Sequence, residues 1–166
     1  MATYQLKVTL QGARPPVWRR VLVPNTIRMD ALHTVIQIAM GWTDSHLHSF
    51  TKGGNCWTLP DPDAYTVSLD LDERKYRCKE ILKKVGDSLL YVYDFGDDWR
   101  HKVVLEAILP DSKTTIPTCT AGKGACPMED SRGYEPEEDD EPAPPFSVAE
   151  AAAVLADERW DPDALL

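Results

Sequence analysis

The distribution of charge divides this chain into two parts and limits where a folded core can lie. After Pro127 there are 13 acidic and two basic side chains, whereas residues 1–127 carry 14 acidic and 16 basic ones. Acidic, proline-rich stretches bury too little apolar surface to fold on their own. We therefore expect one mixed-charge domain over residues 1–134, followed by an acidic, proline-rich segment with a short terminal helix over residues 135–166.

The remaining bulk properties restrict the class of protein. An apolar content of 43% in 166 residues is enough for a substantial core. No apolar run approaches the roughly 18 residues of a membrane span, and the N-terminus does not read as a signal peptide. We therefore expect a cytoplasmic protein without a membrane partner. The net charge of −9 lacks the excess of Lys and Arg that phosphate contacts need, so direct nucleic-acid binding is not expected.

Apolar periodicity predicts the order of the elements. Alternation predicts a first hairpin, and helical spacing then predicts a helix that ends at Gly41. The predicted strands cover residues 4–10, 17–23, 46–52, 56–59, 88–93 and 99–109, and the predicted helices cover residues 29–40, 79–85 and 148–155. We expect an α+β fold, with a twisted, mostly antiparallel sheet of about five or six strands and helices packed mainly on one face. Residues 110–145 show no apolar period, so a long loop is expected there, including the cysteine-containing part at 110–134.

The first polar candidates are Trp18 and Arg20, which share one face of the predicted second strand. An arginine beside an aromatic ring suits recognition of an anion or carboxylate, because the guanidinium group offers a rigid fork of donors. The alternative is a surface strand whose arginine stems cover apolar neighbours.

His46 and His48 form a second candidate pair. Two residues apart in a strand, they would project to one face and could meet one metal ion or one substrate. The alternative is a pair of histidines that are solvated or held by hydrogen bonds.

The run from Tyr91 to His101, YVYDFGDDWRH, is the most distinctive stretch. A buried strand delivers Asp94, a turn carries Asp98, and His101 enters the next strand. Carboxylates beside a histidine can bind a divalent cation or perform acid–base chemistry. The alternative is a hairpin turn in which the carboxylates accept backbone N–H groups.

Cys119 and Cys126 are separated by six residues, which is a wider spacing than structural zinc usually takes. These two cysteines with two of the histidines could still supply four ligands to a divalent metal such as zinc. The candidate metal ligands are therefore His46, His48, His101, Cys119 and Cys126. The alternative is a loop fixed by packing or by thiol contacts.

Four motifs in order, PPVWRRVLVP, AMGWTDSHLHSF, LLYVYDFGDDWRHKVVLE and C-x6-CPMED, resemble the plasmid pRiA4b ORF-3-like family over roughly residues 3–134. The resemblance implies a compact α+β fold of the kind seen in an archaeal member. It also implies a possible origin in plasmids or mobile elements, in which some members travel as passengers. It implies little about activity. After the last cysteine this chain keeps Glu129, Asp130 and Gly133-Tyr134 but lacks the middle of the usual segment.

Together these features predict one polar face that would recognise a small ligand or a protein partner. Its expected residues are Trp18, Arg20, His46, His48, Asp94, Asp98, His101, Glu129 and Asp130. A non-catalytic binding or accessory module is favoured, because no acid, base and nucleophile occur in a known order. The alternative is a metal-dependent hydrolase or nuclease that uses His46, His48, Asp94, Asp98 and His101.

Overall fold

The computed structural model describes residues 2–63, 68–112, 114–133 and 137–166. Its elements follow one another as β1 (Thr3–Leu10), β2 (Val17–Pro24), α1 (Met29–Met40), β3 (His48–Lys52), β4 (Asn55–Thr58), β5 (Leu71–Asp72), a 3₁₀ turn (Glu73–Lys75), α2 (Cys78–Ile81), β6 (Ser88–Tyr93), β7 (Trp99–Leu109), β8 (Thr118–Lys123), α3 (Val148–Asp157) and α4 (Pro162–Leu165).

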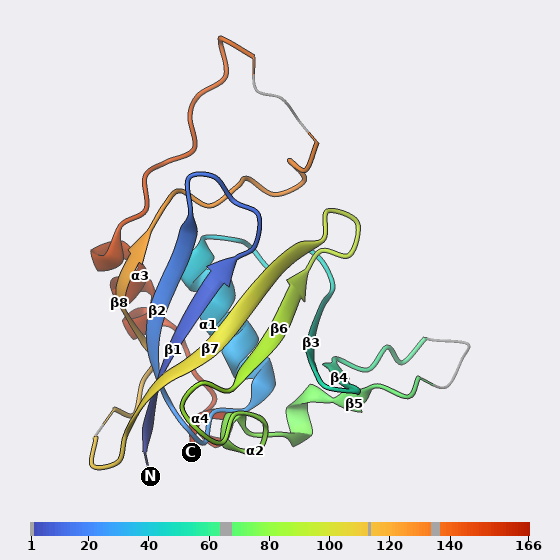
Figure 1. Ribbon diagram of the computed structural model, residues 1–166, viewed down its shortest axis with the longest axis vertical. Coiled ribbons are helices and arrows are strands. Elements are labelled where there is room, and N and C mark those ends of the chain that lie inside the picture. The colour runs from blue at the N-terminus through green and yellow to red at the C-terminus, as the bar shows by residue number, and fades with distance from the viewer. Residues whose placement is uncertain (1, 64–67, 113, 134–136) are drawn as a thin grey trace.

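The strands form one twisted sheet in the order β5-β4-β3-β6-β7-β1-β2-β8 (Figure 1). Every neighbouring pair is antiparallel except β4 and β5. The predicted α+β class with a mostly antiparallel sheet is confirmed. The predicted number of five or six strands was too small, because the sheet has eight.

Helix α1 covers one face of the sheet (Figure 1). Nine of its twelve residues are buried, and its apolar side chains pack against the inward-facing residues of the strands. The helix ends as predicted at Gly41, whose φ of 90° suits a residue without a side chain. This packing places polar residues of α1, among them His33 and Gln37, inside the core.

The edge strand β8 lies within the region that was expected to be a loop. Gly122 in β8 and Gly124 just after it allow close packing: a Cβ on Gly122 would lie 2.4 Å from Phe146 Cε1, and one on Gly124 would lie 2.4 Å from Pro16 O. Glycines that read as loop residues in the sequence are therefore positions of close approach.

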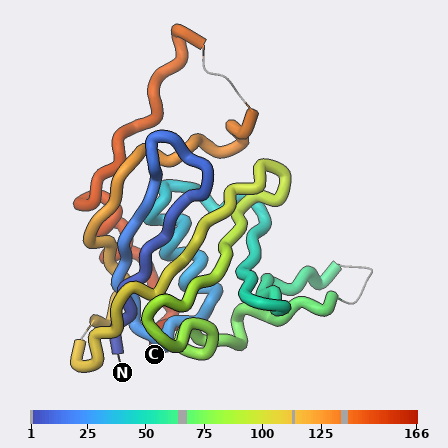
Figure 2. The backbone as a smooth tube through the Cα atoms, in the orientation of Figure 1, coloured from blue at the N-terminus to red at the C-terminus, as the bar shows by residue number. Residues whose placement is uncertain are grey.

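The C-terminal helices share the core with the sheet. Ser147 caps α3 by accepting a hydrogen bond from Glu150 N–H (3.2 Å). Leu155 and Leu165 are buried in the main cluster, and Arg28 N–H donates to Ala164 O (2.7 Å). Figure 2 shows α4 at the same end of the sheet as the start of β1. The described acidic residues 137–141 are exposed, and residues 134–136 lie outside the described part.

Among the described residues no helix has the length and apolar character needed to cross a membrane.

Candidate metal centre

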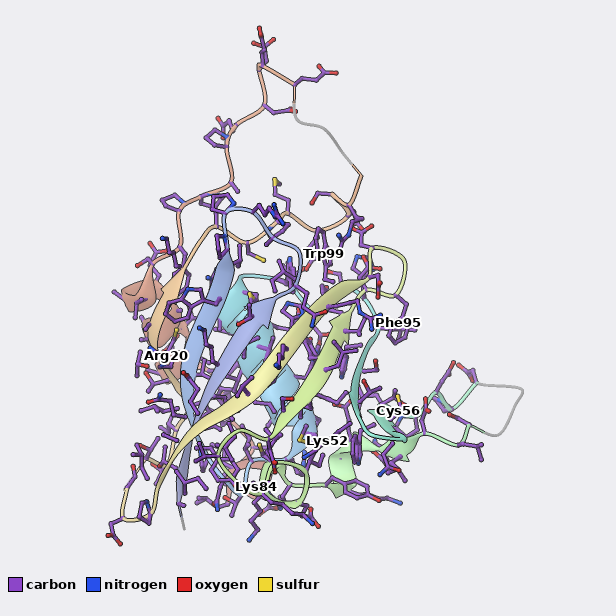
Figure 3. All side chains as sticks on the ribbon, in the orientation of Figure 1. Arg20, Lys52, Cys56, Lys84, Phe95 and Trp99 are labelled. Carbon is purple, nitrogen blue, oxygen red and sulfur yellow. The ribbon has the colours of Figure 1, made fainter. Side chains whose placement is uncertain are left out.

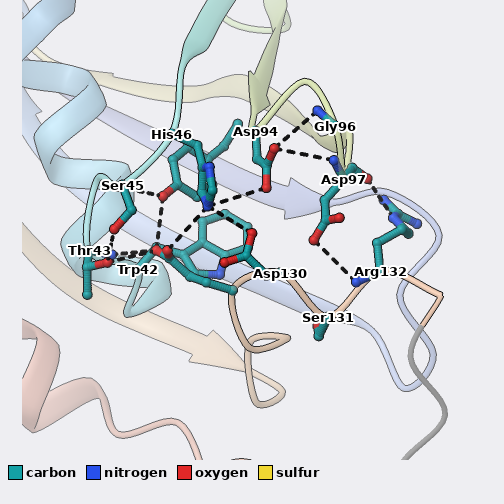
Figure 4. Close-up of polar contacts among 12 residues, drawn as sticks. Trp42, Thr43, Ser45, His46, Asp94, Gly96, Asp97, Asp130, Ser131 and Arg132 are labelled. Carbon is teal, nitrogen blue, oxygen red and sulfur yellow. Dashed lines mark hydrogen bonds and ion pairs between the residues drawn. The ribbon is translucent and has the colours of Figure 1, made fainter.

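The turn after β6 directs one oxygen of Asp94 towards His46. Asp94 has a left-handed backbone (φ 60°), and its Oδ1 accepts hydrogen bonds from the N–H groups of Gly96 (3.1 Å) and Asp97 (3.3 Å). This is a local turn that aspartate commonly forms. The turn leaves Oδ2 free, and Oδ2 lies 3.6 Å from His46 Nε2 (Figure 4).

Glu129 comes from the segment that follows β8, and three hydrogen bonds fix its carboxylate. Oε1 accepts from Thr43 N–H (2.7 Å), Thr43 Oγ1–H (3.1 Å) and Tyr93 O–H (2.9 Å). Burial acts to raise the pKa of Glu129, but the hydrogen bonds from Thr43 and Tyr93 and the nearby His46 outweigh it and lower the pKa. Glu129 is therefore ionised at neutral pH, and its Oε2 lies 3.8 Å from His46 Nε2.

His46 brings these groups together with Asp130. Asp130 Oδ1 lies 3.0 Å from His46 Nε2, but it misses the alignment of a hydrogen bond. The imidazole ring is 29% exposed, whereas Nε2 itself is buried and has no hydrogen-bond partner among the described residues. One ring nitrogen thus faces three carboxylate oxygens, one from Asp94 and two from the neighbouring residues Glu129 and Asp130. Figure 4 shows Asp94 and Asp130 next to His46.

The spacing and charge of this cluster suit a divalent cation. A metal ion about 2.0–2.2 Å from each nitrogen or oxygen ligand places neighbouring ligands roughly 3.0–3.5 Å apart. The observed separations from His46 Nε2 are 3.0 Å to Asp130, 3.6 Å to Asp94 and 3.8 Å to Glu129, so the last two carboxylates lie slightly beyond this spacing. The ligand atoms of His46, Asp94 and Asp130 all lie within 4.8 Å of one another. Without a cation, three converging negative charges meet at most one positive imidazolium. We define His46, Asp94, Glu129 and Asp130 as the carboxylate–histidine centre.

A second histidine cluster lies deeper in the core. The rings of His33 and His48 stack with their centroids 3.4 Å apart and their planes 7° apart. His33 contacts Tyr91 Oη through Nδ1 and Asp44 Oδ1 through Nε2, both at 2.7 Å. His48 Nε2 contacts Glu73 Oε1 at 2.6 Å. We define these five residues and Gln37 as the buried histidine network.

Hydrogen bonding in the buried network assigns the protons of His33. Asp44 N–H donates to Gln37 Oε1 (2.9 Å), so Gln37 Nε2 is the atom that donates to Tyr91 Oη (2.9 Å). The Tyr91 hydroxyl then donates to His33 Nδ1, and His33 Nε2–H donates to Asp44. Burial lowers the pKa of His33 against the opposing effect of Asp44, which agrees with a neutral ring. His33, Asp44 and His48 are close enough for a metal ion, but the contacting ring nitrogens of both histidines already have partners.

The sequence comparisons agree with the motifs. The chain matches the family described as plasmid pRiA4b ORF-3-like protein over residues 2–141. The chain belongs to this family. Within it, the chain is 41% identical over 130 residues to a protein named uncharacterized protein y4hQ, from Sinorhizobium fredii (strain NBRC 101917 / NGR234). That match covers 78% of this chain and 66% of the relative, just under two thirds of its length.

A solved structure has the same fold. It is the crystal structure of a protein of unknown function, MM3350, from Methanosarcina mazei Go1. The two proteins are 36% identical, with a TM-score of 0.67, and the match covers 79% of this chain and 74% of the other. The resemblance inferred from the motifs is therefore confirmed as family membership.

Of the three histidines predicted as site residues, His48 and His101 lie outside the carboxylate–histidine centre. β3 begins at His48, so His46 precedes the strand, and the two side chains join different clusters. His101 is fully buried on β7, where Nδ1 lies 3.2 Å from Tyr91 O and the ring meets the face of Trp42 edge-on. Burial lowers the pKa of His101 to about 4.

Trp18, Arg20 and Asp98 also lie away from the centre. Arg20 makes a two-pronged ion pair with Glu106 (2.8 and 3.0 Å) on the open face of the sheet, beside Trp18. Figure 3 shows Arg20 well separated from Phe95 in the β6–β7 turn. The described ion pair of Asp98 is with Arg100, at 3.6 Å.

The two cysteines of the predicted loop meet a buried arginine instead of the histidines. Burial raises the pKa of Cys126 to about 12 and also raises the pKa of Cys119. Without a metal ion both thiols therefore stay protonated at neutral pH. Among the described residues, neither cysteine belongs to a group of three or more ligand atoms close enough to hold an ion. Arg19 on β2 is the buried arginine. Its guanidinium group lies 3.6 Å from the Phe146 ring centroid and donates hydrogen bonds to four carbonyl oxygens.

The sequence reading missed the groups that support both clusters. Thr43 and Tyr93 hold Glu129, while His33 and Glu73 complete the buried network. A signal was present for His33, because it lies with Gln37 at i, i+4 on the buried stripe of α1. A polar pair on an apolar stripe indicates a buried hydrogen-bond network.

Proposed function

We propose that this protein binds a divalent metal ion through His46, Asp94, Glu129 and Asp130, and that the ion anchors a ligand beside it. The observation that carries the proposal is the buried Nε2 of His46, which has no hydrogen-bond partner among the described residues and faces three carboxylate oxygens. A buried polar atom without a partner is costly. Coordination of a divalent cation removes this cost and offsets two of the three negative charges.

The ligand set favours particular ions. One imidazole with three carboxylates is a mostly hard, oxygen-rich set, which suits Mn²⁺ or Fe²⁺ better than a thiolate-bound zinc site would. The imidazole argues against Ca²⁺ and Mg²⁺, which take oxygen ligands. We therefore expect binding of Mn²⁺ or Fe²⁺ in preference to Mg²⁺.

A hollow of about 1130 Å³ adjoins His46 and supplies room for a ligand. Its lining is mixed: Leu59, Leu71 and Phe95 are apolar, and Asp61 and Asp70 are acidic. Small-molecule sites usually combine an apolar wall with a few polar groups. This supports the proposal that the protein is a binding module organised around an ion.

The exposure of Asp130 favours metal-dependent hydrolysis as a second candidate function. Asp130 is 72% exposed, so an ion at the centre would remain accessible to water. A bound divalent ion makes such water more acidic and thus more nucleophilic at neutral pH. Turnover of bis(4-nitrophenyl) phosphate by Mn²⁺-loaded protein, lost in His46→Ala, would support this function. No turnover with the metal bound would favour the binding module.

Titration calorimetry of untagged, chelator-treated protein tests metal binding. We expect one Mn²⁺ per chain, and at least a tenfold weaker affinity in His46→Ala and in Asp94→Asn. Asparagine at position 94 keeps the Oδ1 that accepts the two turn hydrogen bonds, so the turn is preserved. Asp98→Asn is the matched control, because Asp98 lies in the same turn and also has a left-handed backbone.

Asp98→Asn should therefore bind Mn²⁺ as the natural chain does. Absence of binding to the natural chain would overturn the proposal. So would an equal loss of affinity in Asp98→Asn and Asp94→Asn, since only Asp94 faces His46.

A further inference from the structure

In the described part of the chain, one face of the sheet carries no helix (Figure 1). α1 and α3 pack on the opposite face, and the strands β2, β1, β7 and β6 lie uncovered in front of them (Figure 1). Along β1, β2 and β7, buried residues alternate with partly or fully exposed ones. The outward-facing set therefore forms a continuous surface.

Basic side chains gather on this surface. Partners directly opposite one another in an antiparallel ladder project to the same face. Lys7 lies opposite Arg20, Thr9 lies opposite both Trp18 and Lys102, and Trp18 lies opposite Lys123. The open basic face consists of Lys7, Trp18, Arg20, Arg100, Lys102 and Lys123.

Few acidic groups compensate for this charge. Glu106 pairs with Arg20, and Asp98 lies 3.6 Å from Arg100. Lys7, Lys102 and Lys123 have no ion pair among the described residues. Arg20 and Lys7 lie directly opposite each other, and both lower the pKa of Glu106, which is the acid that offsets them.

Trp18 adds an aromatic surface in the middle of the basic groups. It is partly exposed, with Lys7 Nζ 4.9 Å and Arg20 Cζ 5.2 Å from its ring. Proteins bind single-stranded nucleic acid with basic side chains around aromatic rings, because the cations contact phosphates and the bases stack on the rings.

We propose that the open basic face binds single-stranded nucleic acid. The net charge of −9 argues against this only at long range. At physiological salt the Debye length is about 8 Å, so a ligand on the sheet responds mainly to the local cations. The aromatic platform favours nucleic acid over an acidic protein, because an acidic protein would contact the cations but would not stack on the ring.

Fluorescence anisotropy with a labelled 12-nucleotide single strand tests the proposal on the full chain. With about four phosphate contacts, we expect affinity to fall about 50-fold between 50 and 200 mM salt. Lys7→Ala and Lys102→Ala should each flatten the salt dependence by about one contact. Trp18→Ala should weaken binding about 5- to 150-fold with an unchanged salt dependence. Lys84→Ala is the control, because Lys84 lies at the end of the sheet away from the β6–β7 turn (Figure 3). It removes the same charge and should change neither the affinity nor its salt dependence.

Three results would overturn the proposal. The first is no saturable binding of the oligonucleotide at 50 mM salt. The second is binding that Lys7→Ala and Lys102→Ala leave unchanged. The third is tighter binding of a peptide with the sequence of residues 128–145, or of a 12-base-pair duplex. The peptide result would identify the partner as an acidic protein segment, including that of a second copy. Thermal melts show whether each variant is folded.

Discussion

Two clusters of histidines and acids meet at the segment from Asp44 to His48, which contributes Asp44 and His48 to one and His46 to the other. In the buried histidine network, each contacting ring nitrogen of His33 and His48 has a hydrogen-bond partner. In the carboxylate–histidine centre, His46 Nε2 faces three carboxylates and has no hydrogen-bond partner among the described residues. The first arrangement leaves only a carboxylate oxygen, Glu73 Oε2, without a partner among the described residues, whereas the second leaves the ring nitrogen itself without one.

This difference separates a structural role from a binding role. A satisfied polar network rigidifies a core, and breaking it costs stability. A cluster of converging like charges lowers stability until a ligand of opposite charge arrives. Proximity of histidines and acids is common to both clusters, so the property that distinguishes them is whether the contacting ring nitrogens have hydrogen-bond partners.

The largest expected effect is in the buried network. Glu73 is fully buried, and its Oε1 contacts His48 at 2.6 Å, while Oε2 has no partner among the described residues. His48→Ala leaves this carboxylate unpaired, so we expect the free energy of unfolding to fall by about 3–5 kcal/mol. His46→Ala should change it by less than about 1 kcal/mol in the absence of metal. Urea denaturation measures both.

The double variant His48→Ala/Glu73→Gln is the control for this prediction. It removes the Glu73 charge that His48→Ala leaves unpaired, so it should recover part of the lost stability. If His46→Ala proves as destabilising as His48→Ala, the comparison between the clusters fails.

Much of the fold could be predicted because the local spacing of apolar residues indicates most of its strands and helices. The strands at 88–93 and 99–109 and the end of α1 at Gly41 agree with the structure. β8 could not be predicted, because its pairing with β2 depends on close approach at Gly122 and Gly124. A glycine that permits tertiary packing has the same local pattern as one that terminates a strand.

The candidate residues could be named from the sequence, but their partners could not. His46, Asp94, Glu129 and Asp130 were among the expected residues, and the fold brings them together across more than 80 positions of sequence. The grouping of His46 with His48 relied on strand alternation, which does not apply because β3 begins only at His48. Which imidazole meets which acid is decided by tertiary packing.

His101 sharpens the comparison, because its Nε2 also lacks a hydrogen-bond partner among the described residues. His101 is buried on β7, however, and no described acid contacts it. Burial lowers its pKa to about 4 in the folded state, against an ordinary value of 6.5. Between these pH values the unfolded state binds one more proton than the folded state, so stability falls as pH falls. The contribution is full above about pH 6.5, and about 3 kcal/mol is lost by pH 4.

Urea denaturation at pH 7.5, 5.5 and 4 compares the natural chain with His101→Phe, which cannot titrate. Other acids titrate in both chains, so the difference between them isolates His101. A difference that stays constant with pH would show that His101 is not held neutral by burial.

The smallest expected effect changes sign with metal, and it is therefore the most specific test of the carboxylate–histidine centre. Asp130→Asn removes one of three converging charges, so without metal the free energy of unfolding should rise by a few tenths of a kcal/mol. With Mn²⁺ at about 100 times its Kd, the natural chain should gain about 2.7 kcal/mol, and the variant should gain clearly less. A structural carboxylate would lower stability in both conditions when it is lost. Thermal melts with and without Mn²⁺ decide between these outcomes, because only a metal ligand makes the variant more stable than the natural chain in one condition and less stable in the other.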